Sequence, residues 1–485
     1  MDQETQQPES SAAKREPVGL FIGGRWTRRT GVIEVRNSYD GHLVDVVSAG
    51  NAEDMREAVD AAEGALGGDF PTHQRYTVLM RAAALVEEQQ DEYARIIAAE
   101  GSKTIREARR EPPRAANILR LSAEEGRRLA GETLPFDSRA GSENRIGYYF
   151  RFPVGVVGAI TPFNDPLAMA AHKIGPALAG GNAVVLKPAS ATPLSALHLA
   201  RDLQKAGLPP GRLNVVPGRG EELGAALVSD PRVRLVSFTG GVATGEWISR
   251  HAGIKKLSME LGSNSPVIVL PDADLERAVT AIAAGAFAQA GQNCLGVQRV
   301  LVHDRVYAPF SKRFVEHVSR LRAGSSQDES TDVCAMITKG EADRVESWIG
   351  EAVEKGARVL IGYRRDGNLI WPTVLENVPE GVKLDCQEVY GPVVCLYRVP
   401  SLQDAIEKAN RVTYGLHAAI FTESLRDAFH AVRCLDVGGV IVNDSTDYRL
   451  DVMPFGGTKL SGIGREGIRF ALQEMTETRV VCLNL

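Results

Sequence analysis

Residues 154–160, VGVVGAI, form a short apolar run followed by a helix-like segment, and this unit recurs three times before residue 257. The later runs are AVVLKP at 183–188, LNVVPG at 213–218 and VRLVSFTG at 233–240. Strands buried on both faces of a parallel sheet are apolar along their whole length, and helices connect them. This stretch therefore predicts an α/β fold with a mostly parallel sheet.

The flanking regions extend this pattern in both directions. Residues 52–100 have helical apolar spacing, residues 106–130 are charged and helical, and residues 145–152 (RIGYYFRF) resemble a strand. A second set of strand–helix units begins near residue 256 and continues to about residue 443. The final stretch, TETRVVCLNL, alternates like an edge strand, which in an open sheet invites pairing with another subunit. We therefore expect a homodimer or homotetramer.

Composition excludes several classes of protein. The chain has 485 residues, of which 44% are hydrophobic and 24% charged, so it can form two or three domains. The net charge of -5 provides no basic surface for nucleic acid or for an anionic membrane. No apolar stretch is long enough to span a bilayer, and the polar residues 1–17 lack a signal-peptide core and are expected to form a mobile tail. The expected location is the cytoplasm.

The six cysteines are scattered along the chain and form no CxxC motif. Because none lies at zinc-ligand spacing from a histidine, neither structural disulfides nor a metal site is expected. A single cysteine is most often a small buried hydrophobic residue. The six are Cys294, Cys334, Cys386, Cys395, Cys434 and Cys482.

Two glycine-rich turns, residues 217–224 and 237–245, follow predicted strands, although GxGxxG and Walker motifs are absent. Glycine lets the backbone approach a pyrophosphate, and free N–H groups at a helix start favour anionic oxygen. Lys187 adds a charge suited to a ribose or phosphate. Each feature alone is more often an ordinary turn, but together they indicate a nucleotide site. The relevant glycines are Gly220, Gly224, Gly240 and Gly241.

Three residues carry chemistry: Cys294 in GQNC, Glu260 in MELG and Asn164 in TPFN. A cysteine nucleophile reacts as the thiolate and needs a lowered pKa or an adjacent base. Burial of Glu260 between Met and Leu would raise its pKa toward neutrality, as a general base requires. The Asn164 amide could donate a hydrogen bond to a developing oxyanion, although asparagine after proline is commonly a turn former.

The chain resembles the aldehyde dehydrogenase superfamily over roughly residues 18–485. The resemblance implies a Rossmann-like cofactor domain (18–130 and 153–257), an α/β catalytic domain (258–443), and a β-arm for oligomerisation with a C-terminal substrate-side loop (131–152 and 444–485). The matching segments are TPFN (161–164), LKPA (186–189), FTGG (238–241), MELGSNSP (259–266), GQNC (291–294), EVYGPV (388–393) and PFGGTKLSGIGREG (454–467).

This resemblance implies that Cys294 attacks a small aldehyde and that Asn164 with the Cys294 N–H forms the oxyanion hole. After oxidation by NAD or NADP, Glu260 would activate water to hydrolyse the thioester. Lys187 and Glu388 would hold the two riboses. Ser190 stands where relatives selective for NAD often carry an acid, so NADP is admissible. Other expected cofactor contacts are Thr161, Pro162, Phe163, Phe238, Thr239, Glu260, Leu261, Gly262 and Tyr390.

Two segments, GQNC–LGVQR and YRLDVMPFGG, are similar to the group that acts on lactaldehyde, glyceraldehyde phosphate and phosphono-aldehydes. Arginines at corresponding places in that group hold a phosphate, phosphonate or carboxylate. Asp165 would repel such an anion unless an arginine pairs with it. We expect a short polar aldehyde with an acidic group. The expected substrate-side residues are Arg114, Arg120, Asp165, Asn293, Arg449 and Phe455, the last an architectural residue.

The sequence also allows two alternatives to hydrolytic aldehyde oxidation. An acylating enzyme, acting with CoA or phosphate, would run the thioester chemistry in reverse. Its relatives that use CoA lack the base, so Glu260 argues against it. A non-catalytic structural relative would be favoured by loss of Cys294, Glu260 or Asn164, and all three are present.

Overall fold

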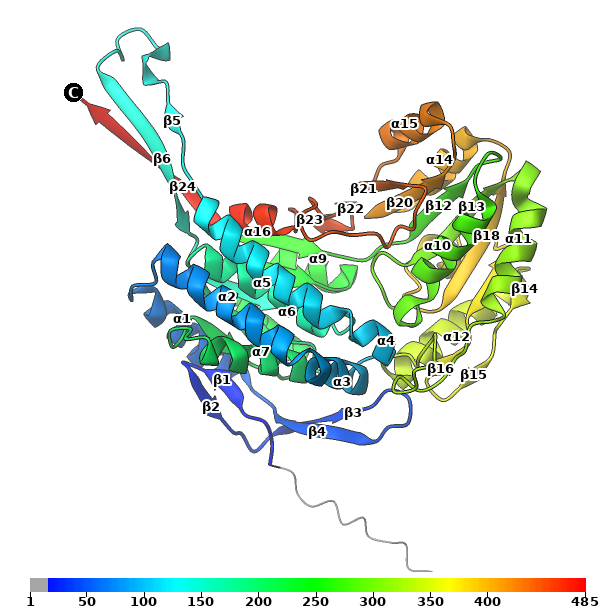
Figure 1. Ribbon diagram of the computed structural model, residues 1–485, viewed down its shortest axis with the longest axis horizontal. Helices are drawn as coiled ribbons and strands as arrows, with labels where there is room; N and C mark the ends of the chain where they lie inside the picture. The colour runs from blue at the N-terminus through cyan, green and yellow to red at the C-terminus, as the bar shows by residue number, and fades with distance from the viewer. Residues whose placement is uncertain (1–15) are drawn as a thin grey trace, which may run out of the picture.

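The computed structural model describes residues 16–485, so most of the expected polar tail, residues 1–17, lies outside the described residues. Two largely parallel sheets, each covered by helices, form two lobes that lie side by side, and a β-arm projects from the first lobe (Figure 1). The predicted α/β architecture is confirmed. Within residues 16–485, no helix combines the length and the apolar character needed to cross a bilayer.

The sheet of the first lobe has eight strands in the order β2-β1-β9-β8-β7-β10-β11-β23. Its five central strands run parallel and include all four apolar runs that predicted it. They are β7 (Val156–Ile160), β8 (Ala183–Lys187), β9 (Leu213–Val215), β10 (Val233–Thr239) and β11 (Lys256–Glu260). The antiparallel edge strands are β1 (Leu20–Ile22), β2 (Arg25–Thr27) and β23 (Gly462–Ile463).

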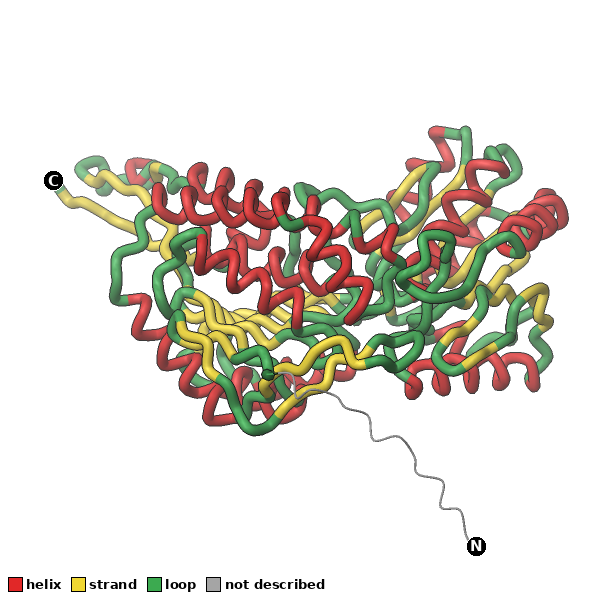
Figure 2. The backbone as a smooth tube through the Cα atoms, turned by 60° about the horizontal axis from the view of Figure 1, so that its bottom comes forward, coloured by secondary structure: helices red, strands yellow, loops and turns green. Residues whose placement is uncertain are grey.

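Helices lie on both sides of this sheet (Figure 2). α6 is buried at every position because it packs against the sheet on one side and α5 on the other, which explains its apolar sequence. The buried Glu111 carboxylate accepts hydrogen bonds from the first N–H groups of α6, at Leu167 (2.8 Å) and Ala168 (2.9 Å). The helices of this lobe are α1 (Ala52–Leu66), α2 (Thr72–Glu88), α3 (Gln90–Glu100), α4 (Ile105–Ala108), α5 (Glu111–Arg128), α6 (Pro166–Ala179), α7 (Leu194–Lys205), α8 (Gly220–Ser229), α9 (Val242–His251) and α16 (Ile468–Glu474).

The sheet of the second lobe has seven strands in the order β14-β17-β18-β13-β12-β20-β21, parallel except for β14. Its strands are β12 (Ser265–Val269), β13 (Val297–His303), β14 (Arg358–Ile361), β17 (Thr373–Glu376), β18 (Val393–Val399), β20 (His417–Phe421) and β21 (Gly439–Val442). Its helices are α10 (Leu275–Phe287), α11 (Asp304–Val318), α12 (Lys339–Glu354), α13 (Lys383–Cys386), α14 (Leu402–Asn410) and α15 (Leu425–Cys434).

The arm is a three-stranded sheet in which β24 (Thr476–Asn484) pairs along the whole of β6 (Arg145–Pro153), with β5 (Thr133–Leu134) on the other side. The predicted C-terminal edge strand is confirmed, because β24 has a neighbour on one side only. Short elements complete the chain: β3 (Val32–Arg36), β4 (Leu43–Ser48), η1 (Phe136–Ser138), η2 (Ala288–Gly291), β15 (Arg365–Asp366), β16 (Leu369–Ile370), β19 (Tyr414–Gly415) and β22 (Thr458–Lys459).

Candidate active site

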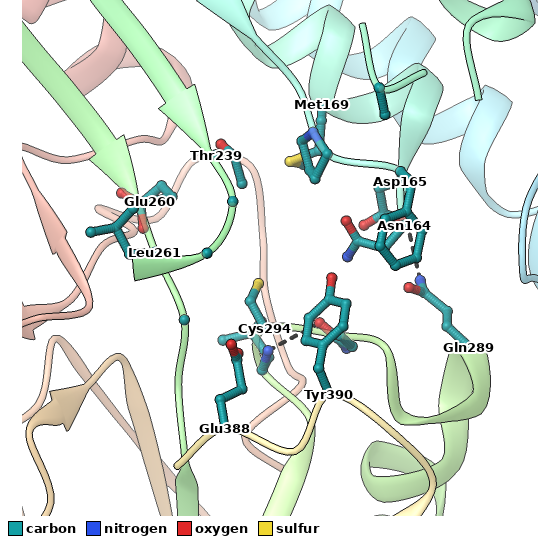
Figure 3. Close-up of a pocket in the computed structure, with 18 of the residues that line it drawn as sticks. Asn164, Asp165, Met169, Thr239, Glu260, Leu261, Gln289, Cys294, Glu388 and Tyr390 are labelled. Atoms are coloured by element: carbon teal, nitrogen blue, oxygen red, sulfur yellow. Dashed lines mark hydrogen bonds between the residues drawn. The ribbon is translucent and has the colours of Figure 1, made fainter. Parts of the chain in front are cut away.

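A pocket of about 1050 Å³ lies between the lobes and contains all three predicted catalytic residues (Figure 3). Asn164 follows β7 and Glu260 ends β11, so both come from the carboxyl edge of the first sheet. Cys294 lies on the loop between α10 and β13 of the second lobe. The pocket is thus built at the carboxyl ends of parallel strands, where α/β proteins commonly bind ligands.

A left-handed turn after α10 presents Cys294 to the pocket. Gln289 (φ 54°), Ala290 (φ 56°) and Gly291 (φ 68°) all have positive φ, which is costly for residues other than glycine. A Cβ on Gly291 would lie 2.1 Å from the carbonyl oxygen of Gly391, so only glycine fits this position. Such strain persists only where the surrounding structure holds the turn in place.

The first lobe holds this turn through Gln289. The Gln289 backbone N–H donates a hydrogen bond to Glu107 Oε1 (2.8 Å), and its side-chain amide donates to Asp165 Oδ1 (3.2 Å; Figure 3). Asp165 directly follows Asn164. The turn carrying Cys294 is therefore bonded to the turn carrying the predicted oxyanion donor.

The Cys294 thiol is half-buried and packs against Leu295, Leu416 and Phe455. Burial raises the pKa of the thiol, and the Arg449 guanidinium acts in the opposite direction by favouring the thiolate. Arg449 lies over the Phe455 ring, 3.6 Å from its centre. Phe455 itself is buried behind the thiol and is not among the residues that line the pocket.

Both carboxylate oxygens of Glu260 are buried and have no hydrogen-bond partner among residues 16–485. Burial, with the nearby negative charge of Glu466, raises the pKa of Glu260 well above its ordinary value. Glu466 is ionised because Lys173 and Arg449 outweigh its burial and lower its pKa to about 2. A Cβ on Gly456 would lie 2.8 Å from Glu260 Oε1, so glycine leaves room for this carboxylate.

Asn164 is buried and lines the same pocket. Within the described part of the chain, no other group forms a hydrogen bond with its side-chain amide. Its N–H donors are therefore available to an oxygen atom of a bound molecule.

The predicted nucleotide-binding residues offer unpaired donors. The Lys187 ammonium, at the end of β8, is buried, and among residues 16–485 it has no hydrogen bond or ion pair. Burial lowers the pKa of Lys187 to about 8. The Thr239 hydroxyl is likewise buried, and the described part of the chain offers it no hydrogen-bond partner. Gly241 caps the N-terminus of α9, and the space where its side chain would lie is open. A ribose at Lys187 and a pyrophosphate at α9 would satisfy these groups.

Glu388 approaches the same pocket from the second lobe. Its Oε1 accepts a hydrogen bond from the Ser263 N–H (2.8 Å), and a Cβ on Gly262 would lie 2.4 Å from its other oxygen. Burial raises the pKa of Glu388 to about 7.

Most of the predicted cofactor contacts line the pocket. These are Pro162, Phe163, Phe238, Thr239, Gly240, Gly241, Glu260, Leu261, Gly262, Glu388 and Tyr390. The predicted contacts outside the pocket lining are Thr161, Lys187, Ser190, Gly220 and Gly224.

Carboxylates surround the predicted substrate-side arginines. Arg114 lies 3.1 Å from Asp451 Oδ1 and 3.5 Å from Asp165 Oδ2, and Arg449 lies 3.2 Å from Glu466. Burial raises the pKa of Asp165, but Lys103 and Arg114 outweigh it and bring the pKa below its ordinary value. Asp165 is thus ionised and paired with an arginine, the condition under which an anion could enter the pocket.

Arg120 does not reach the pocket, contrary to the expectation. Its guanidinium pairs with Glu87 on α2. Arg120 is six residues beyond Arg114, which turns α5 by about 600° and places the two side chains about 120° apart around the helix axis. Arg110, four residues before Arg114, does line the pocket and was missed, although the helical spacing could have indicated it.

Lys103 was also missed. Its buried ammonium bridges Glu111 and Asp165 and lines the pocket. A single lysine in the sequence GSKT carries no pattern that would have marked it. The remaining expected residue, Asn293, lines the pocket and donates a side-chain hydrogen bond to Asp447.

A family model described as the aldehyde dehydrogenase family matches residues 26–481. The chain belongs to the aldehyde dehydrogenase family. The 3-sulfolactaldehyde dehydrogenase of Priestia aryabhattai is 46% identical over 98% of this chain and 100% of its own length. The family predicted from the sequence is therefore confirmed.

Solved aldehyde dehydrogenase structures superpose closely on this chain. Aldehyde dehydrogenase 21 from Physcomitrella patens, in complex with its reaction product succinate, has a TM-score of 0.94 at 37% identity and covers 97% of this chain and 99% of its own. The NADP-dependent glyceraldehyde-3-phosphate dehydrogenase of Bacillus halodurans, complexed with NADP, also has a TM-score of 0.94, at 38% identity, and covers 97% of this chain and 100% of its own. The protein is an NAD(P)-dependent aldehyde dehydrogenase.

Proposed function

We propose that this aldehyde dehydrogenase oxidises a short aldehyde bearing a sulfonate, phosphonate, phosphate or carboxylate to the corresponding carboxylic acid. One observation carries the proposal: the pocket that contains Cys294, Asn164 and Glu260 also contains the guanidinium groups of Arg114 and Arg449. Both guanidinium groups already form ion pairs, Arg114 Nη2 with Asp451 Oδ1 (3.1 Å) and Arg449 Nη2 with Glu466 Oε2 (3.2 Å). Among residues 16–485, Arg449 Nε has no hydrogen-bond partner. A planar guanidinium suits an oxyanion.

The names of three relatives support an acidic substrate. They mention 3-sulfolactaldehyde, succinate and glyceraldehyde 3-phosphate, each of which carries an acidic group. Those molecules differ in length and charge. What they share is an anion at the end of a short chain, and this is the feature that we transfer to the present enzyme.

In the proposed mechanism, the Cys294 thiolate attacks the aldehyde carbon, and Arg449 favours the thiolate electrostatically. The side-chain amide of Asn164 and the backbone N–H of Cys294 donate hydrogen bonds to the oxyanion that forms. Lys187, Glu388 and the N-terminus of α9 would hold NAD(P), which supplies a hydride acceptor. Cys294 then holds the acyl group as a thioester.

Glu260 completes the proposed reaction. Its carboxylate accepts a proton from a water molecule, and the resulting hydroxide attacks the thioester carbon and releases the acid and the Cys294 thiolate. Burial raises the pKa of Glu260, which makes the carboxylate a stronger base than an exposed glutamate. Hydrolysis, rather than transfer to CoA or phosphate, follows from this base. The acylating alternative predicts instead that product formation depends on CoA or phosphate.

The substrate proposal is tested with two aldehydes of equal chain length, succinate semialdehyde and butanal. Arg114→Met should lower kcat/KM for succinate semialdehyde by about 10-fold or more, because a charged hydrogen bond is lost. The value of kcat/KM for butanal should change much less. Arg120→Met on the same helix is the matched control, since Arg120 pairs with Glu87 outside the pocket. Equal losses for both aldehydes, or no loss, would contradict the anion-binding role.

We also propose that the enzyme is a cytoplasmic homodimer or homotetramer assembled through the arm. The exposed edge of β24 can accept a strand from another subunit. Exposed apolar side chains lie on the arm and would be covered in an assembly: Ile146, Phe150, Val480, Leu483 and Leu485. All six cysteines are free, as a reducing compartment requires. Sedimentation of wild type and Val480→Lys should show a loss of the larger species in the variant.

A further inference from the structure

We infer that Asp165 binds a hydroxyl group on the carbon chain of the aldehyde substrate. This inference rests on the proposed function because it concerns the same pocket. It adds a second recognised group to the anion already proposed, and it makes a hydroxyaldehyde the preferred class of substrate.

Asp165 is placed to contact the substrate. It directly follows Asn164, the proposed oxyanion donor, and its carboxylate lies beside that side chain in the pocket (Figure 3). The side chain of Asp165 is 17% exposed, whereas its partner Lys103 is 4% exposed. The negative charge of Asp165 also contributes to raising the pKa of Cys294, after burial and Glu388, so the carboxylate and the thiol are within electrostatic reach.

One oxygen of Asp165 remains available. Oδ1 accepts hydrogen bonds from Lys103 and from Gln289. Oδ2 lies 3.5 Å from the Arg114 guanidinium, which is an ion pair but longer than a normal hydrogen bond. A carboxylate oxygen has two lone pairs, so Oδ2 can accept a hydrogen bond from a bound molecule.

The charges around Asp165 favour a neutral donor. Lys103 and Arg114 already balance its negative charge, so a substrate cation would gain little and would lie beside two positive groups. A substrate anion would face the carboxylate itself. A hydroxyl group donates one hydrogen bond to the ionised oxygen without adding charge, and such charge-assisted bonds are stronger than neutral ones.

Another pocket carboxylate, Asp447, is less suited to this role. It accepts a hydrogen bond from Asn293 of the loop that carries Cys294, and burial raises its pKa. Asp165 instead has a lowered pKa, so it is ionised and acts only as an acceptor near neutral pH.

The first test compares lactaldehyde with propanal, two uncharged aldehydes of equal length that differ by one hydroxyl. In the wild-type enzyme, kcat/KM calculated from the concentration of unhydrated aldehyde should be about 10-fold or more higher for lactaldehyde than for propanal. The cationic 3-aminopropanal should be used less well than propanal. Equal values for lactaldehyde and propanal, or a preference for 3-aminopropanal, would overturn the inference.

The second test uses variants. Asp165→Leu should abolish the preference for lactaldehyde, and Asp165→Asn should keep a weaker preference because a neutral amide oxygen still accepts. Glu87→Gln, which alters a carboxylate outside the pocket, should keep the wild-type ratio. An unchanged ratio in both Asp165 variants overturns the inference. If Asp165→Leu does not fold, as circular dichroism would reveal, Asp165→Asn and the wild-type comparison decide.

The outcome is independent of the anion proposal. Lactaldehyde and propanal carry no charge, so their ratio reports only on the hydroxyl group. The ratio of succinate semialdehyde to butanal reports only on the anion. An enzyme that discriminates one pair and not the other identifies which of the two proposals has failed.

Discussion

The side-chain amide of Gln289 donates a hydrogen bond of 3.2 Å to Asp165 Oδ1 across the boundary between the two lobes. This bond joins the loop that ends in Cys294 to the loop that begins with Asn164. The relative position of nucleophile and oxyanion donor therefore depends on a side chain that takes no part in the chemistry. Small errors in such positions are costly to catalysis.

Gln289→Leu should lower kcat by about 10-fold for charged and uncharged aldehydes alike, because Cys294 and Asn164 lose their alignment. The dissociation constant of NADP, measured by fluorescence, should stay unchanged. Gln403→Leu is the matched control, since Gln403 bonds to Glu407 on the exposed side of α14. A loss confined to KM would contradict a positioning role.

Cys294→Ala should reduce NAD(P)H formation by at least about 10³-fold, because no thioester can form. Cofactor binding should persist, since Lys187, Glu388 and α9 are untouched. Cys434→Ala alters an exposed thiol and should retain full activity. Appreciable turnover in the Cys294 variant would refute its assignment as nucleophile.

Glu260→Gln should give a rapid burst of NAD(P)H followed by slow steady turnover, because acylation proceeds and hydrolysis lacks its base. The raised pKa of Glu260 means that its carboxyl is protonated, and inactive as a base, at low pH. Wild-type kcat should therefore rise with pH as the group ionises. Stopped-flow traces across a pH series check both points. An unchanged steady-state rate in the variant, or the same rise of kcat with pH as in the wild type, would rule out Glu260 as the general base.

Ser190→Glu should lower kcat/KM for NADP by about 10-fold or more, because the new carboxylate repels a 2′-phosphate. The value of kcat/KM for NAD should change much less. The Ser190 hydroxyl donates a hydrogen bond to the Gly218 carbonyl oxygen (2.7 Å), within the glycine-rich turn that leads into α8. Ser229→Glu at the exposed end of α8 controls for added charge. Equal changes in kcat/KM for NADP and NAD would show that residue 190 does not distinguish a 2′-phosphate from a 2′-hydroxyl.

Local sequence patterns predicted the two sheets and the edge strand, because buried parallel strands and alternating edge strands have distinct apolar spacing. The short strands β1 to β4 were not anticipated. They are only three to six residues long, which is too short for an apolar period to mark them: β1 is buried throughout, and only β3 alternates in exposure.

The structure brings together the candidate residues that lie in distinctive motifs, whereas charge pairing places other residues at the site that no motif indicates. Asn164, Glu260 and Cys294 lie in distinctive segments and come together in one pocket. Arg114 and Asp451 are separated by 337 positions, so no local pattern could reveal their ion pair. Arg120 pairs with Glu87 outside the pocket because it lies on a different face of α5 from Arg114, and the composition of an arginine-rich helix does not show which face each side chain occupies.

The division of the active site between two sheets makes turnover a reporter of folding. Asn164 and Glu260 belong to one sheet and Cys294 and Glu388 to the other, so each half can form its secondary structure while the enzyme is still inactive. On dilution from denaturant, the circular dichroism signal should recover before activity. The delay between the two signals is the time that the two halves need to dock. At low denaturant, activity should disappear before secondary structure melts, because the contact between the halves opens first.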